Sequence, residues 1–185
     1  MKDKLEELNA CSNAIDWIAD KSLEQAWNEC ERGDWLLWYS YRMMNEGKIT
    51  LKQLIKAKVG CANLVRHLMK DERSINALGV LERFANGEAT RDELNTAASA
   101  AYAASAADYD SAAYAAAYAA YDAAAAAAAS AAADYAADAA AASAAYAAAA
   151  SASAAAYDAS DAVRKQTLKK CAEIVREIIT YEMIK

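Results

Sequence analysis

The stretch DAAAAAAASAAADYAADAAAASAAYAAAASASAAAYD, residues 122–158, decides what kind of fold this chain can adopt. It belongs to a longer tract, residues 97–162, in which 43 of 66 residues are alanine and seven are aspartate. The tract contains no glycine, lysine or arginine. Alanine has the highest intrinsic helix propensity of all residues, so the composition predicts helix rather than a flexible spacer.

Two other roles for an alanine-rich tract conflict with the same residues. A membrane span would bury its aspartates in hydrocarbon at a high cost in free energy, and the tract lacks the leucine, isoleucine and valine that drive insertion. An ice-binding rod would need a regular ladder of threonines, and the tract has no threonine. We therefore predict no membrane association for this chain.

The length of the tract indicates that it folds back on itself. A single helix would extend for about 100 Å at about 1.5 Å per residue, with little area to bury along it. We expect a close-packed layer of helices instead, in which tyrosines supply the bulk that alanine lacks. The densest helix-capping residues predict breaks at 108–111 and 157–161, and near Asp122 or Ser130.

Capping signals divide the first half of the chain into short helices. Ser22, Thr50 and Thr90 are each followed three residues later by Gln or Glu, which is the capping-box pattern of a helix start. Glycine favours the left-handed conformation that ends helices, and the glycines expected in this role are Gly33, Gly47 and Gly87. Gly60 is expected to kink or split a helix. The predicted helices span about 4–19, 22–32, 34–46, 50–69, 73–86 and from 91 onward.

The whole composition predicts an all-α protein, a multi-helix bundle. The chain has no proline and one phenylalanine, and all five glycines lie in its first half. We expect residues 1–90 to form a subdomain of short amphipathic helices. Residues 91–185 would supply the alanine-rich helices and a docking helix, packed with the first part as one globular unit. The docking helix has an apolar stripe at helical spacing: Leu168, Cys171, Val175, Ile178 and Ile179.

Charge and cysteine content narrow the class of protein. The net charge of −6 argues against direct nucleic-acid binding, which needs clustered lysine and arginine. Four cysteines without a C-x-x-C pair predict reduced, small apolar core residues. The first residues, MKDKLEEL, are charged and contain no apolar signal segment, so a cytoplasmic protein is expected.

Motifs for catalysis are sparse. His67 is the only histidine, and one histidine with dispersed cysteines predicts no zinc or iron site. The sequence contains neither a G-x-S-x-G element nor a glycine-rich phosphate loop. We therefore expect no enzyme, no cofactor and no metal, and an enzyme acting through His67 is the least favoured alternative.

The segment GDWLLWYSYR, residues 33–42, is the first candidate binding site. Trp35 and Trp38 share one helix face, and Tyr39 and Arg42 follow them. Apolar side chains surround this helix, so it is either the hub of the domain or it presents one aromatic face for recognition. Tryptophan, tyrosine and arginine dominate binding hot spots and also stack on nucleobases.

Two further candidate sites are charged. Arg66, His67 and Arg73 lie around a predicted helix–helix turn, which is either a solvated turn or a polar pocket for an anion. The aspartates of the alanine tract could form a uniformly negative face that steers a basic partner, or could merely keep the surface soluble. The aspartates chosen to represent this face are Asp122, Asp134 and Asp138.

An ordered series of short motifs resembles a known family. Cys11 to Trp17 reads C-x-x-A-I-D-W. After this motif come, in order, GDWLLW, a helix with Cys61 and His67, an Asp-Glu-Arg turn, NGEATRDEL and alanine/tyrosine/aspartate repeats. This order is similar to that of alanine-rich proteins from bacteria and their phages that are labelled immunity proteins. The resemblance covers about residues 9–180, although family members commonly have proline where this chain has Ser74.

The resemblance implies a stoichiometric neutraliser rather than a catalyst. The first hypothesis is an immunity or counter-defence protein that inhibits a protein target, either a toxin or a defence effector. The alternative is a sponge that sequesters a nucleotide messenger, with Trp35 or Tyr39 stacking on the base and Arg42, Arg66 or Arg73 holding phosphate. A homo-oligomer is a further expectation, because each alanine-rich helix buries little area.

Overall fold

The computed structural model describes residues 1–107 and 157–185, and every regular element assigned within them is helical. This confirms the predicted all-α class. The breaks expected at 108–111 and near Asp122 or Ser130 lie outside the described residues. The elements are α1 (Lys2–Glu7), α2 (Ser12–Ile18), α3 (Leu23–Glu29), α4 (Gly33–Asn45), α5 (Leu51–Asn63), η1 (Arg66–Leu68), α6 (Glu72–Asn86), α7 (Arg91–Ala107), α10 (Tyr157–Ile178) and α11 (Tyr181–Ile184).

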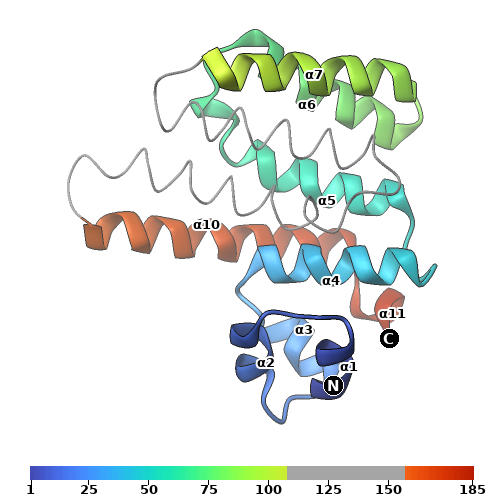
Figure 1. Ribbon diagram of the computed structural model, residues 1–185, viewed down its shortest axis with the longest axis vertical. Helices are drawn as coiled ribbons and strands as arrows, with labels where there is room; N and C mark the ends of the chain where they lie inside the picture. Colours follow the sequence, from blue (N-terminus) through green and yellow to red (C-terminus); the bar gives the residue numbers. More distant parts are fainter. Residues whose placement is uncertain (108–156) are drawn as a thin grey trace.

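The described helices pack in successive layers (Figure 1). Helices α1, α2 and α3 lie at one end beneath α4, while α6 and α7 lie side by side at the other end. Helix α5 connects the two parts, because its residues enter two hydrophobic clusters. Leu54, Ala57 and Cys61 pack with α4 and α10, whereas Ile55 and Val59 pack with α6 and α7. The expected division of the chain at residue 90 stays a prediction.

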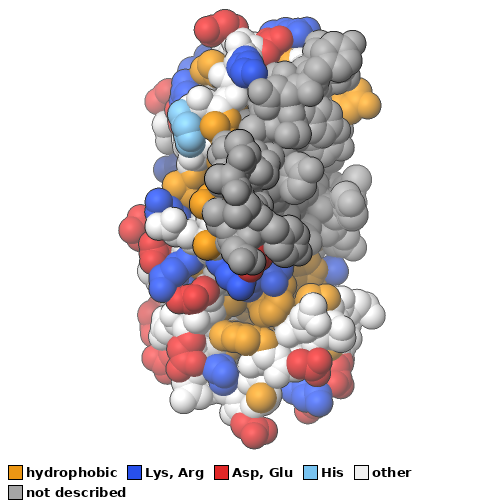
Figure 2. Space-filling model, turned by 90° about the vertical axis from the view of Figure 1, so that its left-hand side faces the viewer, with side chains coloured by type: hydrophobic (Ala, Val, Ile, Leu, Met, Phe, Trp, Pro, Cys, Tyr) orange, Lys and Arg blue, Asp and Glu red, His pale blue; other side chains and the backbone are white. Residues whose placement is uncertain are grey.

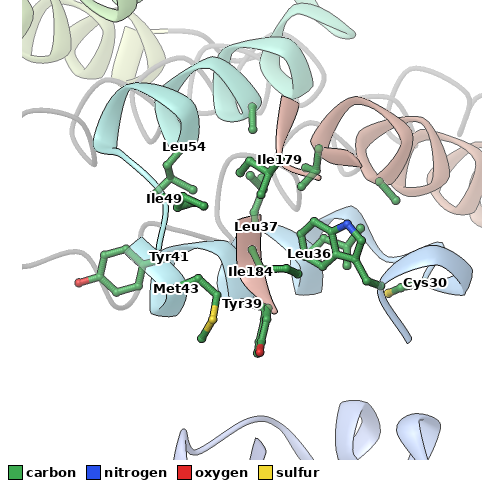
Figure 3. Close-up of a cluster of buried hydrophobic side chains, with 14 of the residues drawn as sticks. Cys30, Leu36, Leu37, Tyr39, Tyr41, Met43, Ile49, Leu54, Ile179 and Ile184 are labelled. Carbon is green, nitrogen blue, oxygen red and sulfur yellow. The ribbon is translucent and has the colours of Figure 1, made fainter. Parts of the chain in front are cut away.

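Helix α4 is the hub of the cluster that contains the N-terminal helices. Leu37 and Met43 are fully buried, Tyr39 and Tyr41 are nearly so, and the side chains of this cluster come from both ends of the chain (Figure 3). Ile179 and Ile184 contribute to the same cluster, so the C-terminal helices complete a core that the first half of the sequence begins. On its buried side, segment 33–42 is therefore the hub of the domain, which is one of the two roles that the sequence predicts for it.

Two glycines allow α10 to dock closely on α4 and α5. A Cβ at Gly33 would lie 2.3 Å from the Cβ of Cys171, and a Cβ at Gly60 would lie 2.5 Å from Cγ2 of Ile174. The prediction that a helix ends at Gly33 is wrong, because Gly33 is the first residue of α4. The prediction of a kink or split at Gly60 is also wrong, because α5 runs through it to Asn63. At both positions the missing side chain makes room for a neighbouring helix.

Helix ends follow local hydrogen bonding. The capping boxes at Ser22, Thr50 and Thr90 are confirmed, with both reciprocal hydrogen bonds present at each. The single helix predicted over 4–19 is wrong: Asn9 adopts φ +57°, and the N–H groups of Asn9 and Ala10 bond back to Glu6 and Leu5. This Schellman-type end uses asparagine, the residue that best tolerates the left-handed region after glycine.

The described part of the alanine tract packs tightly. Ala97, Ala98 and Ala101 of α7 are buried in the cluster that includes Leu78 of α6, and Ala104 is buried as well. Small methyl groups on one face allow the two helix backbones to approach closely. Alanine therefore serves as a packing residue in this part of the tract, as the sequence predicts.

Candidate functional site

The N-terminal helices and α4 line a pocket of about 60 Å³, here called the tryptophan pocket. All four tryptophans of the chain line it, although they come from three different helices. The complete lining is Met1, Leu5, Ala14, Trp17, Ile18, Leu23, Ala26, Trp27, Cys30, Trp35, Leu36, Trp38 and Tyr39. An apolar concave surface with so many aromatic rings is typical of a ligand- or partner-binding site.

The aromatic rings contact one another in two pairs. Trp17 of α2 meets Trp35 of α4 edge-on, with ring centroids 6.1 Å apart. Trp27 of α3 is tilted against Tyr39 of α4, with ring centroids 6.4 Å apart. Ring pairs of these geometries stabilise a fixed arrangement beyond the area they bury. The pairs therefore fix α2 and α3 against α4 and give the pocket its shape.

Basic side chains stack on the rings of three tryptophans. The guanidinium of Arg32 lies 4.4 Å from the ring centroid of Trp35, and that of Arg42 lies 5.2 Å from Trp38. The ammonium of Lys21 lies 4.8 Å from the ring of Trp17. Each cation is attracted by the negative face of the indole. Figure 2 shows hydrophobic side chains at the surface in the lower part of the molecule, below a row of basic side chains.

Arg32 is held in place by a second contact. Its Nε donates a hydrogen bond of 2.9 Å to Asp34, and its Nη2 donates to the other oxygen of the same carboxylate. The side chain of Asp34 is nearly buried at the start of α4, where a carboxylate is also stabilised by the helix dipole. A two-point Arg–carboxylate pair leaves little rotamer freedom, so the cation on Trp35 is preorganised.

Two buried polar atoms in the pocket lining lack a hydrogen-bond partner among the described residues. They are the indole Nε1 of Trp27 and the phenolic oxygen of Tyr39. Burial raises the pKa of Tyr39 to about 12, with Glu46 and Tyr181 adding to the effect, so the hydroxyl keeps its proton. Leaving one such group unpaired costs about 1–3 kcal/mol. Both atoms are covered by neighbouring groups in this structure.

The C-terminal helix α10 supports the wall formed by α3. Arg176 donates hydrogen bonds from Nη1 to the backbone oxygens of Cys30, at 2.7 Å, and Trp27, at 3.3 Å. The carbonyl of Trp27 lies in the last turn of α3 and that of Cys30 at its C-cap, where carbonyls lack a partner within the helix. Lys169 pairs with Glu31 at 2.6 Å in the same connection. The position of Trp27 therefore depends on residues nearly 150 positions further along the chain.

The structure brings together part of the first predicted site. Trp35, Trp38 and Tyr39 line the tryptophan pocket, and Arg42 stacks on Trp38. Sequence analysis did not select Trp17, Trp27, Lys21 or Arg32. Their one available signal was the confinement of all four tryptophans to residues 17–38, with a basic residue near most of them.

The second predicted site lies elsewhere. Arg66 and His67 are exposed on η1, and Arg73 is exposed in the first turn of α6. Arg73 makes a 2.7 Å ion pair with Asp71, the N-cap of α6, and this pair lowers the pKa of Asp71 to about 2. The hydrophobic cluster beneath this turn is the one shared with α7, so these residues do not join Trp35 around a common cavity.

The remaining predicted site residues are not part of the described structure. Asp122, Asp134 and Asp138 lie outside the described residues. Within the described residues, no three histidine, cysteine or acidic side chains converge as a metal site would require. The same residues include no helix whose length and apolar character would let it span a membrane. Cys30, Cys61 and Cys171 are buried thiols as expected, whereas the prediction of a buried Cys11 is wrong because it is exposed.

Comparison of the chain with protein-family models, with curated proteins and with solved structures gives no match. The class of protein that the described residues define is an all-α bundle with an aromatic pocket at its N-terminal end.

Proposed function

We propose that this chain is a non-enzymatic immunity or counter-defence protein that neutralises a protein target in the cytoplasm by stoichiometric binding. The observation that supports the proposal is the tryptophan pocket. All four tryptophans line it, and three of their rings each have a basic side chain stacked on them. Tryptophan, tyrosine and arginine are the residue types that contribute most to protein–protein hot spots.

The outer edge of the pocket has the properties of a hot spot. Trp17, Trp35 and Trp38 are half-buried, so their rings are fixed but still offer apolar area to a partner. The pair of Arg32 with Asp34 fixes the cation next to Trp35 before a partner arrives. Rings and charges that are already ordered lose little conformational entropy on binding, and affinity rises accordingly.

The acidic tract would act at an earlier stage of the encounter. Seven aspartates without a lysine or arginine give residues 97–162 a uniform negative charge. Such a charge raises the association rate of a basic partner and makes that rate depend on ionic strength. We assign steering to Asp122, Asp134 and Asp138, and anchoring to the tryptophan pocket.

A nucleotide sponge is the second candidate. The stacking of Arg32 on Trp35 combines an aromatic ring with a positive charge, which is the combination that binds a nucleobase beside a phosphate. The pocket of about 60 Å³ is, however, far smaller than the roughly 300–1,000 Å³ of a typical small-molecule site. Size therefore argues against a whole nucleotide in this pocket.

The two candidates differ in how variants affect protection. The target is first captured from host lysate, and protection of the purified target is then titrated with each variant. We expect Trp35→Ala to weaken protection at least tenfold, and the triple change of Asp122, Asp134 and Asp138 to Lys to slow association and reduce its salt dependence. Tyr102→Ala, an exposed aromatic on α7, is the matched control.

Three outcomes decide the proposal. Full protection by both Trp35→Ala and the aspartate triple variant contradicts the proposed surface. Protection that tracks release of a heat-stable nucleotide from the purified protein, with Trp35→Ala releasing none, supports the sponge instead. Turnover of a substrate that requires His67 would contradict both candidates and make the protein an enzyme.

A further inference from the structure

The interior of the tryptophan pocket has its own binding chemistry, separate from the outer edge that the proposed protein partner would use. Its volume of about 60 Å³ has room for roughly four to six waters, since each water needs about 10–15 Å³ of such space. A molecule with about half a dozen non-hydrogen atoms fills that volume. The lining is almost entirely apolar, so water gains few hydrogen bonds there.

Two lining residues carry a buried polar atom without a hydrogen-bond partner among the described residues, and these atoms restrict the class of ligand. Trp27 Nε1 is a pure donor, and the Tyr39 hydroxyl donates as long as it is protonated. Neither atom has a partner among the described residues, and both are shielded from solvent. Tyr39 points from α4 towards the N-terminal helices (Figure 3). An uncharged ligand with one acceptor oxygen would satisfy a donor that is otherwise costly to bury.

A charged ligand does not fit the same lining. The side chains around the interior are Leu5, Ile18, Leu36 and the aromatic rings, and the lining contains no Asp, Glu, Lys, Arg or His side chain. Transfer of a carboxylate into such an environment is strongly unfavourable, and a ligand ammonium would meet three tryptophan rings that already have a cation stacked on them. The cations Lys21, Arg32 and Arg42 are stacked on tryptophans but are not part of the lining.

We propose that the interior of the tryptophan pocket binds a small, uncharged, ring-sized apolar compound that bears one carbonyl oxygen, which accepts a hydrogen bond from Trp27 Nε1 or the Tyr39 hydroxyl. Both atoms are covered in the unliganded pocket, so binding includes a small rotation of one of the two side chains. Side-chain rearrangements of this size are common on ligand binding. The proposal does not rest on the identity of any protein partner.

The test compares two probes of the same shape on the full-length protein. Cyclopentanone carries a carbonyl, and methylenecyclopentane replaces that oxygen by a CH₂ group. Titrations are followed by the ¹⁵N–¹H signals of the four indole N–H groups, with Trp27 assigned through Trp27→Phe. We expect saturable shifts with cyclopentanone, and a downfield shift of the Trp27 indole signal if Trp27 is the donor. Cyclopentanone should bind several-fold to tenfold more tightly than methylenecyclopentane does.

Variants locate the acceptor contact. Trp27→Phe keeps an aromatic ring without its donor, Tyr39→Phe removes only the hydroxyl, and Tyr102→Phe on α7 is the control. One of the two pocket variants should bind the two probes with about equal affinity, whereas the control should keep the preference for cyclopentanone. If Trp27→Phe fails to fold, the probe pair and Tyr39→Phe still decide.

Two results would overturn the inference. The first is the absence of saturable indole shifts with either probe, which means that the pocket does not admit a ligand of this size. The second is equal affinity for the two probes, which means that the cavity is purely apolar and that the donors play no part. Because neither experiment uses the target of the proposed neutralisation, a failure here leaves that proposal standing, and the converse holds too.

Discussion

Gly33 of α4 lies against Cys171 of α10 so closely that a Cβ at position 33 would come within 2.3 Å of the Cβ of Cys171. The same Cβ would lie 2.8 Å from the backbone nitrogen of Ala172. Cys171 and Ala172 are both fully buried, and rotation of a side chain cannot relieve a clash with backbone. The close approach of α4 and α10 therefore requires that position 33 has no side chain.

Replacement of this glycine should separate the two helices. We expect Gly33→Ala to lower the free energy of unfolding by about 1–3 kcal/mol or more, as overpacking does in cores. A protein of this size should lose about 2–4 °C in melting temperature per kcal/mol. Thermal and urea denaturation measure both quantities.

Gly79 provides the matched control for that change. It lies within α6, and a Cβ there would meet nothing within 4 Å. Gly79→Ala should stabilise the protein by about 0.5–1 kcal/mol, because alanine loses less backbone entropy in a helix. Equal melting temperatures for the two variants would show that the close approach at Gly33 is not a constraint.

The alanines of α7 should differ sharply by face. Ala101 is fully buried against α6, whereas Ala103 is exposed. Ala101→Leu should destabilise by about 1–3 kcal/mol through overpacking, and Ala103→Leu should stay within about 0.5 kcal/mol of the parent. Urea unfolding of both variants tests whether alanine is a packing residue here. A neutral Ala101→Leu would mean that α7 can move away from α6 at little cost.

The hydrogen bonds from α10 to α3 can be removed while a long unbranched side chain is kept at position 176. Arg176→Met keeps an unbranched chain but leaves the backbone oxygens of Trp27 and Cys30 without their donor, at an expected cost of about 1–3 kcal/mol. Amide hydrogen exchange should accelerate in α3 more than in α6. Arg164→Met, at an exposed position of the same helix, controls for the loss of charge. Uniform acceleration in both helices would argue against a local role.

Stability should fall in alkaline solution for a specific reason. Burial raises the pKa of Cys30 from 9.0 to about 11 and that of Tyr39 from 10.0 to about 12. Between pH 9 and 12 the unfolded chain releases these protons first, so it binds fewer protons than the folded chain, and the free energy of unfolding decreases as pH rises. Below about pH 8 both groups are almost fully protonated in both states and contribute almost no slope.

The alkaline slope is measured by urea titration at a series of pH values. Cys30→Ala and Tyr39→Phe should each make it shallower. Cys11→Ala removes an exposed thiol and serves as the control. A slope that none of the three variants changes would assign the alkaline loss of stability to other groups.

Local chemistry made part of the fold predictable from sequence. The capping boxes at Ser22, Thr50 and Thr90 depend on residues only three positions apart, so their pattern was sufficient. Gly33 and Gly60 could not be interpreted in the same way. A glycine that ends a helix and a glycine that admits a neighbouring helix look alike in sequence, and the partners at Cys171 and Ile174 are more than a hundred positions away.

The candidate site shows the same limit. Trp35 and Trp38 were selected because they share a face of one helix, a relationship that helical spacing reveals. Trp17 and Trp27 join them only through the packing of α2 and α3 on α4, which no spacing within a helix records. Arg66 and Arg73 were selected for their charge, but the fold places them over a different hydrophobic cluster.

The docking of α10 also has a consequence for synthesis on the ribosome. Ile179 and Ile184 belong to the same core as Leu5, so the first helices to emerge wait for nearly the entire chain before their core closes. Until then the surfaces of α4 and α5 around Gly33 and Gly60 stay open to water and to chaperones. A nascent chain that stops within the alanine tract would expose these surfaces permanently, and proteases could distinguish it from the finished protein.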